Sequence, residues 1–89
     1  MACYNDMYAV ACIAAASRAG LNVPGEVAII GMDDEAVSAY TLPALTTIRL
    51  HVMDFAHHLW TRASAMLDGS PAPERASSML FSLVRRQSA

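Results

Sequence analysis

Two polar pairs in the chain have side chains suited to holding a small ligand. Asn5 is followed by Asp6, and Asp33 is followed by Asp34, and each pair comes directly after a short apolar stretch. An amide donates and accepts hydrogen bonds, whereas an ionised carboxylate only accepts, so Asn5 and Asp33 together suit the hydroxyls or ring N–H groups of a small neutral molecule. The two pairs therefore predict a recognition site.

The same residue types also begin helices. The side-chain oxygens of Asn and Asp accept hydrogen bonds from the first free amides of a helix. Asn5 and Asp6 are equally typical of a helix N-terminus, and Asp33 and Asp34 are equally typical of caps on a helical turn over residues 35–40. Sequence position alone leaves both roles open.

Catalytic and metal-binding chemistry has weaker support. Asp33, Asp34 and Glu35 could hold Mg²⁺ at a strand end, which makes a magnesium-dependent α/β enzyme the main alternative. However, the chain has no lysine and no glycine-rich phosphate loop to steady a phosphoryl group. His57 and His58 are adjacent and would point about 100° apart on a helix, so they cannot share a metal. We expect no enzyme activity, no cofactor and no resident metal.

The elements that would position these residues follow from apolar spacing and from turn residues. Helices are expected over residues 6–19, which end before Gly20, and from residue 52 to a stop at Gly69. Strands are expected over residues 2–4, 27–30, 46–49 and 78–84, with a helical turn at 36–40 and a polar tail at 85–89. The apolar face of the second helix is expected at Val52, Phe55, Ala56, Leu59, Ala63, Met66 and Leu67, with Trp60 at its margin as a packing or interface residue.

This order of elements predicts the α/β class, with a three-layer, mainly parallel sheet flanked by helices. In such a sheet, ligands bind beyond the carboxyl ends of the strands. If the first helix is a right-handed crossover between the first two strands, Asn5 and Asp33 open onto the same edge.

Composition limits what the chain does by itself. With 89 residues, 55% of them apolar, the chain has more buried-type residues than so small a globule can hide, so part of its surface should meet another chain. A formal charge of −2 gives no electrostatic surface for DNA. Cys3 and Cys12 fit buried, reduced thiols of a cytoplasmic protein, and the longest apolar stretch, residues 8–16, is too short to span a membrane.

Five motifs then carry a resemblance over essentially the whole chain. They are CYNDMYA at 3–9, AGLNVPGEV at 19–27, IGMDD at 30–34, PALTTIR at 43–49 and SLVRRQS at 82–88. In this order and spacing they resemble the effector-binding domain of the lactose-repressor (LacI/GalR) family of bacterial transcription regulators. That domain resembles a periplasmic sugar-binding protein, in which two α/β subdomains joined by three crossover segments close on a sugar or purine.

The resemblance implies that residues 1–89 are the C-terminal portion of the effector-binding domain, a partial periplasmic-binding-protein-like fold. Asn5 and Asp33 would contact a small-molecule effector such as a sugar, whereas Asp6 and Asp34 would cap helices or support the contact residues. The family binds DNA through an N-terminal helix-turn-helix head, which is not in this sequence. The implied crossovers fall at residues 49–51 and around Ser77. His51 departs from the family, which more often has a residue suited to a tight crossover there, including proline.

The resemblance also implies a dimer interface. It would include Val10 on the first helix and the segment with Tyr40, Thr41 and Leu42. We expect a homodimer or a swapped dimer, because a strand edge without its neighbour has unpaired amides and carbonyls that pair with another chain. A purely structural dimerisation fragment without ligand binding is the remaining alternative.

Overall fold

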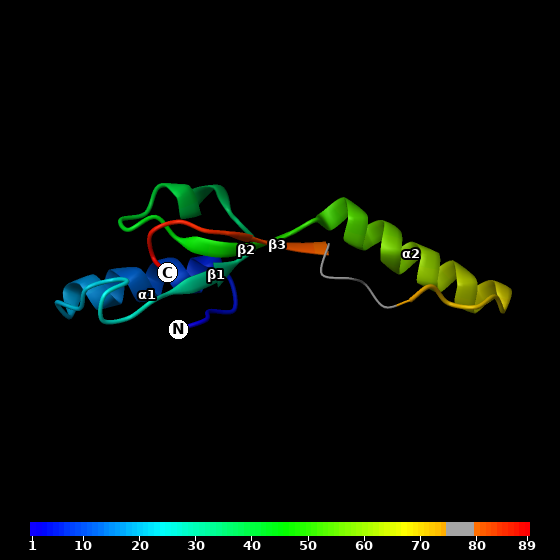
Figure 1. Ribbon diagram of the computed structural model, residues 1–89, viewed down its shortest axis with the longest axis horizontal. Helices are drawn as coiled ribbons and strands as arrows, with labels where there is room; N and C mark the ends of the chain where they lie inside the picture. The colour runs from blue at the N-terminus through cyan, green and yellow to red at the C-terminus, as the bar shows by residue number, and fades with distance from the viewer. Residues whose placement is uncertain (75–79) are drawn as a thin grey trace. The chain divides into compact units, whose positions relative to one another are not determined.

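The computed structural model describes residues 1–74 and 80–89 of the chain (Figure 1). The chain divides into two units: unit 1 is Met1–Arg49 with Leu83–Ala89, and unit 2 is Leu50–Ser82. The elements in chain order are α1 (Asp6–Arg18), β1 (Ile30–Met32), the 3₁₀ helix η1 (Ala36–Ala39), β2 (Thr46–Leu50), α2 (Val52–Asp68) and β3 (Phe81–Val84). Both predicted contact residues, Asn5 and Asp33, belong to unit 1.

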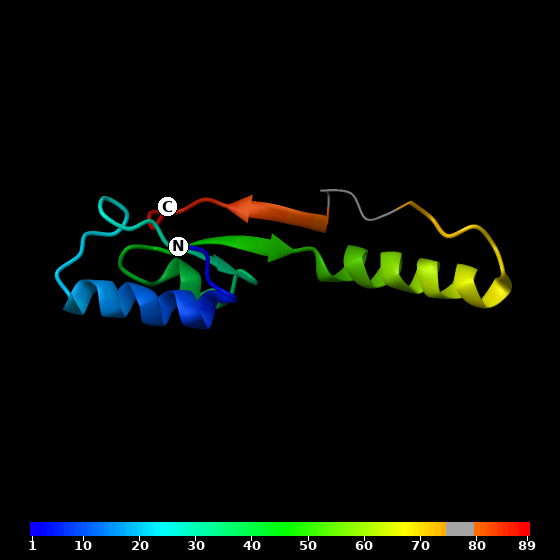
Figure 2. The ribbon, with the colours of Figure 1, turned by 90° about the horizontal axis from the view of Figure 1, so that it is seen from below.

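The strands form one sheet in the order β1-β2-β3. β1 and β2 are parallel, with Ile30 opposite Thr46 and Met32 opposite Ile48. Ala2 adds a parallel bridge to Ile30. The arrows of β2 and β3 point in opposite directions in Figure 2, so the sheet is mixed. The predicted α/β class is confirmed.

Local signals place both ends of α1 close to their predicted positions. Asn5 is extended (φ −152°) and its side chain accepts a hydrogen bond from the Tyr8 amide at 3.1 Å, which caps the helix. At the other end Gly20 has φ +74°, and the Leu21 amide donates to the Ala16 carbonyl at 2.9 Å. This glycine-dependent C-cap satisfies carbonyls that the last turn leaves free.

The core of unit 1 lies between α1 and the sheet. Ala9, Ile13, Ile29 and Leu45 are each at most 5% exposed and pack together. Small residues on the inner face of α1 let the helix approach β1 closely, so the residues that precede α1 come near the end of β1.

The strand that follows α1 and the C-terminal tail both differ from their predictions, because the tail pairs with the chain just before that strand. The strand predicted at 27–30 is β1 at Ile30–Met32, and the predicted polar tail at 85–89 is bound to the sheet. Ser88 is fully buried: its hydroxyl donates to the Ile29 carbonyl at 2.6 Å and accepts from the Thr46 amide at 2.8 Å, while the Ile29 amide donates to the Ser88 carbonyl. The chain before Ile30 therefore pairs with the tail, and the β1–β2 ladder starts only at Ile30.

Unit 2 contains α2, which ends at Gly69 (φ +70°) as predicted. The His51 amide, just before α2, donates to the Leu80 carbonyl at 2.8 Å, a bond that a proline could not make. The apolar face predicted for α2 is mostly exposed, and the helix residue that is buried is Ala65. Exposed members of that face include Val52, Leu59, Met66 and Leu67, and Trp60 is 70% exposed.

The final strand begins later than predicted. β3 is Phe81–Val84, whereas the prediction began at residue 78. Residues 75–79, which include the crossover position expected around Ser77, lie outside the described residues. Among the residues that the structure describes, no helix is long and apolar enough to cross a membrane.

Candidate functional site

A fully buried carboxylate, that of Asp6, joins the elements around the predicted site. Its Oδ2 accepts hydrogen bonds from the Glu35 amide at 2.7 Å and the Ser38 hydroxyl at 2.5 Å, and its Oδ1 accepts from the Thr47 hydroxyl at 2.5 Å. These donors come from the loop after β1, from η1 and from β2. We call this set the Asp6 network. A buried carboxylate without such donors would be strongly destabilising, so the network fixes the three elements relative to α1.

The Asp6 network also requires a glycine in β1. A Cβ placed on Gly31 would lie 2.1 Å from the Asp6 Oδ1 and 3.0 Å from the Leu45 Cδ2. Contacts this short are incompatible with a side chain unless Asp6 moves. Gly31 therefore permits the close approach of β1 to the start of α1.

Asn5 and Asp33 lie on two loops that this network holds together. Asn5 precedes Asp6, and Asp33 lies two residues before Glu35, whose amide donates to Asp6. The Thr47 hydroxyl, which donates to Asp6, also accepts a long hydrogen bond of 3.4 Å from the Asp34 amide. The contact roles of Asn5 and Asp33 remain predictions, but their backbones are held near the same strand ends.

The cap role of Asn5 leaves it able to bind a ligand as well. The cap uses one lone pair of Oδ1. The two Nδ2 hydrogens and the second lone pair of the amide are not needed by the cap. For Asn5, helix capping and ligand recognition are therefore compatible roles.

Asp33 and Asp34 do not cap η1. The N-cap of η1 is Glu35, with no hydrogen bond from its side chain, and the Asp6 network satisfies its amide instead. Both aspartates have positive φ, +105° for Asp33 and +55° for Asp34, in the region that L-residues rarely adopt. Asp33 is exposed, and its amide donates to the Ile48 carbonyl at 2.8 Å.

The Asp34 carboxylate is held by two arginines. Its Oδ1 is 2.7 Å from Nη2 of Arg86, and its Oδ2 is 2.6 Å from Nη2 of Arg49 and accepts from Nε of Arg49 at 2.8 Å. We call these three side chains the Asp34 clasp. The Asp34 side chain is 9% exposed, that of Arg86 is 20% exposed and that of Arg49 is 51% exposed. The hydrogen bond from Arg86, supported by Arg49 against the effect of burial, lowers the pKa of Asp34 below its ordinary value.

The clasp argues against the magnesium site that Asp33, Asp34 and Glu35 could have formed. Both Asp34 oxygens already accept from guanidinium groups, whose positive charge disfavours a cation at the same carboxylate. Within residues 1–74 and 80–89, no group of three or more His, Cys, Asp or Glu side chains could hold a metal ion.

An exposed aromatic pair, not singled out from the sequence, flanks Asn5. The rings of Tyr4 and Tyr8 lie edge to face with centroids 6.3 Å apart, and they are 84% and 63% exposed as whole residues. Tyr8 lies one helical turn beyond Asn5, and Tyr4 is its chain neighbour. The sequence signal that could have identified this pair is the presence of a tyrosine on each side of Asn5, a candidate ligand residue.

Cys3 and Cys12 are free thiols, as expected, and each is partly buried. Their Sγ atoms are 3.9 Å apart. Burial, together with the hydrogen bond to Cys12, raises the pKa of the Cys3 thiol above its ordinary value.

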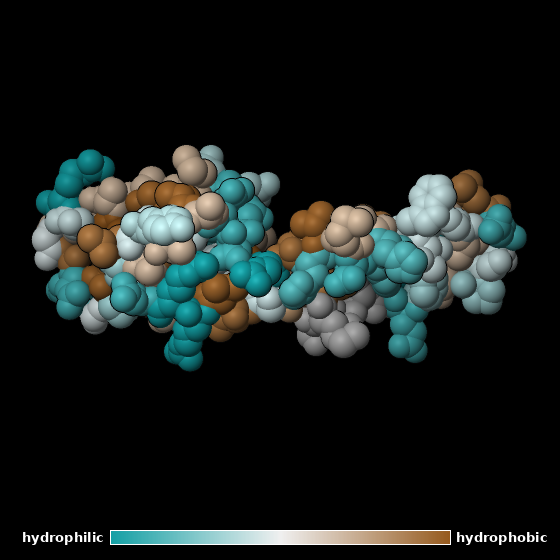
Figure 3. Space-filling model, turned by 90° about the horizontal axis from the view of Figure 1, so that it is seen from above, coloured by the Kyte–Doolittle hydropathy of each residue, from teal (hydrophilic) through white to brown (hydrophobic). Residues whose placement is uncertain are grey.

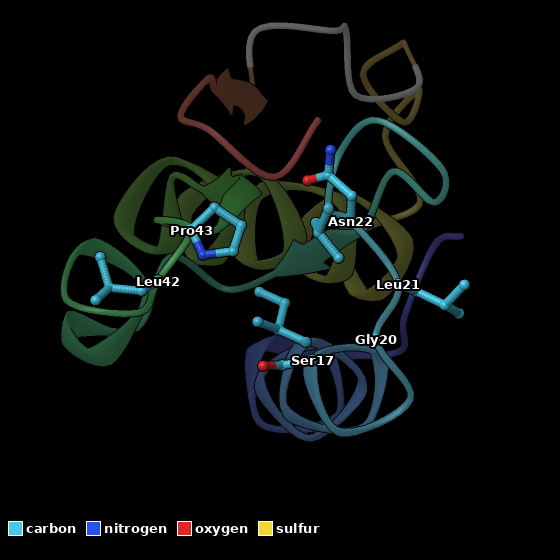
Figure 4. Close-up of a pocket in the computed structure, with 8 residues that line it drawn as sticks. Ser17, Gly20, Leu21, Asn22, Leu42 and Pro43 are labelled. Carbon is cyan, nitrogen blue, oxygen red and sulfur yellow. The ribbon is translucent and has the colours of Figure 1, made fainter.

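The predicted interface residues surround a groove in the surface of unit 1, next to α1. Val10, Thr41 and Leu42 help to line a hollow of about 370 Å³, and Tyr40 and Leu42 are 84% and 89% exposed. A second hollow of about 360 Å³ shares Leu42 and Ser17 with the first, and in it Leu42 and Pro43 lie across from Ser17 (Figure 4). Neither hollow is lined by Asn5 or Asp33. Figure 3 shows apolar side chains at the surface of both units on the face that it draws.

Comparisons with known proteins agree on one type of domain. A family model described as "periplasmic binding protein-like domain" matches residues 1–89. The HTH-type transcriptional regulator GalR of Escherichia coli is 40% identical over 88 residues, which are 99% of this chain and 26% of GalR. The chain thus spans about a quarter of the length of this relative.

Two solved structures show the same likeness in three dimensions. A LacI-family sugar-binding transcriptional regulator from Escherichia coli, complexed with phosphate, has a TM-score of 0.73 at 32% identity, over 99% of this chain and 31% of that one. A LacI-family regulator from Lactobacillus casei with bound sucrose has a TM-score of 0.68 at 28% identity, over 99% of this chain and 32% of that one.

The close contact of Gly31 with Asp6 predicts a non-additive pair of substitutions. Gly31→Ala should lower the free energy of unfolding by about 1–3 kcal/mol, because its Cβ would overlap the Asp6 carboxylate. In an Asp6→Ala background the overlap with Oδ1 is gone, so the same substitution should cost clearly less. Urea unfolding followed by circular dichroism on the four variants of the cycle measures the difference. Equal costs in both backgrounds would contradict the proposed contact.

The Asp34 clasp predicts a defined pH dependence of stability. The pKa of Asp34 in the folded chain is below its ordinary 3.8, so its stabilisation is present above that value and is lost as the pH falls through the folded-state pKa. Asp34→Asn should lower the free energy of unfolding by about 1–3 kcal/mol near neutral pH, and the two curves should converge in acid. Asp68→Asn, at an exposed position in α2, is the matched control and should show no such pattern. A difference that does not change with pH would refute the role of the Asp34 charge.

Proposed function

Because the chain belongs to the periplasmic binding protein-like domain family, in the form found in LacI/GalR transcription regulators, we propose that it forms the part of an effector-binding domain that contacts a small sugar. Asn5 and Asp33 are the proposed contact residues. We further propose that the whole protein senses this effector as a dimer and binds DNA through a separate domain.

The observation that supports the ligand role most strongly is the pairing of the Asn5 and Asp33 loops by the Asp6 network. An amide with free donors and an exposed carboxylate on adjoining loops provide donor and acceptor groups for sugar hydroxyls. The hydrogen bonds that hold both backbones would limit the conformational entropy that binding costs. The exposed rings of Tyr4 and Tyr8 add apolar faces against which a sugar ring can pack.

The ligand proposal can be tested on the chain by NMR. A panel of neutral mono- and disaccharides that includes sucrose, the ligand of the Lactobacillus casei regulator, is titrated into the ¹⁵N-labelled chain. We expect amide shifts centred on residues 4–8 and 33–35. Asn5→Ala and Asp33→Ala should each weaken binding by about tenfold or more, since each removes hydrogen bonds to the ligand.

The same titration is repeated on E. coli GalR in which this chain replaces the matching segment, so that ligand contacts from the rest of a full-length regulator are present. Ser17→Ala, at an exposed position in α1 away from Asn5, is the control and should leave affinity unchanged. Absence of any sugar response in both contexts, or a response that the Asn5 and Asp33 substitutions do not alter, would refute the ligand role.

The dimer proposal rests on the exposed apolar residues around the α1 groove. Leu42 is 89% exposed between two hollows, an arrangement that suits insertion into a partner surface. We therefore expect light scattering to give twice the chain mass of 9.5 kDa, and Leu42→Arg to shift the chain toward monomer.

The matched control is Leu67→Arg, because Leu67 in α2 is 85% exposed and so differs from Leu42 mainly in position. This control should remain dimeric. A monomeric unaltered chain, or dissociation by Leu67→Arg and not by Leu42→Arg, would contradict an interface at α1. A dimer that survives both substitutions would favour strand exchange.

A further inference from the structure

The backbone at Asp33 and Asp34 is held in a conformation that it would not adopt alone. With φ at +105° and +55°, the two residues lie in regions that non-glycine residues rarely adopt. Such conformations persist where the surrounding structure enforces them. The contacts that enforce this one therefore determine where the Asp33 carboxylate lies.

The contacts lie on both sides of Asp33. Its own amide donates to the Ile48 carbonyl at 2.8 Å, which extends the β1–β2 ladder by one bond. The next residue is anchored by the Asp34 clasp, with ion pairs of 2.6 Å to Arg49 and 2.7 Å to Arg86. Arg86 is itself fixed, because its Nη1 donates to the Leu45 carbonyl at 2.8 Å.

The two arginines lie on the segments by which the chain leaves and re-enters unit 1. Arg49 is the last residue of unit 1 before Leu50, and Arg86 belongs to the returning segment Leu83–Ala89. A single carboxylate, next to the proposed ligand residue, thus bonds to both segments.

We propose that Asp34 is a positioning residue for the ligand site: through Arg49 and Arg86 it sets the backbone at Asp33 and couples this residue to both segments that connect the units. This role rests on the proposed function of Asp33. We assign no ligand contact to Asp34 itself, because its side chain is 9% exposed and both of its oxygens accept hydrogen bonds from the arginines. A ligand that binds Asp33 would act on both segments through the clasp.

The test compares the unaltered chain with Asp34→Asn, which keeps the shape of the side chain and removes its charge. Positive φ brings a residue's amide and α hydrogens close together, so the unaltered chain should give a strong NOE between these two hydrogens of Asp33. In Asp34→Asn this NOE should weaken, and sucrose or another responding sugar should bind about tenfold less tightly. In the unaltered chain, sugar should also shift the amides of Arg49 and Arg86, and in Asp34→Asn these shifts should be lost.

Further variants separate positioning from loss of folding. Arg49→Gln removes the more exposed arginine and should have a smaller effect than Asp34→Asn, so it decides the question if Asp34→Asn does not fold. Arg86→Lys keeps the charge but cannot bond Asp34 and the Leu45 carbonyl with one planar group, and it should also weaken the Asp33 NOE. Asp68→Asn is the control and should change neither readout.

Each outcome has a distinct meaning. A folded Asp34→Asn chain with an unchanged Asp33 NOE, or with unchanged sugar affinity, would overturn the positioning role. If no sugar shifts the residues around Asn5 and Asp33 in the unaltered chain or in the GalR replacement, the proposed function fails. The Asp33 NOE in the variants then still decides whether Asp34 positions Asp33.

Discussion

The geometry of unit 1 depends on the burial of one charged-type side chain, Asp6, at the start of α1. Burying a carboxylate costs free energy that only a full set of hydrogen bonds offsets, and Asp6 has donors from the loop after β1, from η1 and from β2. None of these donors can move without leaving the carboxylate unsatisfied. The start of α1 and the end of β1 are therefore fixed together, with Gly31 providing the space between them.

The carboxylates of Asp6 and Asp34 are stabilised by different kinds of donor, and this distinguishes both from Asp33. Neutral donors bond to the fully buried Asp6 carboxylate, and arginines pair with the Asp34 carboxylate, which is 9% exposed, so both side chains are committed to structural contacts. Asp33 directly precedes Asp34 in the chain, and it is exposed. Asn5 caps α1 with its side-chain oxygen, and under the proposed function its amide hydrogens would contact the ligand. The hydrogen bonds of these side chains thus distinguish the residues with structural roles from those proposed to bind a ligand.

Sequence patterns predicted the features that local chemistry determines. These features depend on residues close to each other in the chain. They are the helix cap at Asn5, the glycines that end α1 and α2, and the α/β order of elements. Features that depend on distant partners were missed: the hydroxyl donors of Asp6 are 32 and 41 residues away, and Ser88 bonds to Ile29 across 59 residues. The apolar face of α2 illustrates another limit, since periodicity identifies a face that prefers burial but not the element that would cover it.

If Asn5 and Asp33 bind a ligand as proposed, the location of both residues in unit 1 has an energetic consequence. Every described contact that sets the backbones of Asn5 and Asp33 is internal to this unit, from the Asp6 network to the Asp34 clasp. These residues are therefore arranged before any ligand arrives, and little of the binding free energy is lost in ordering them. Under the proposed function, a ligand bound to Asp33 would act through the Asp34 clasp on Arg49 and Arg86. These arginines lie where the chain leaves unit 1 and where it returns.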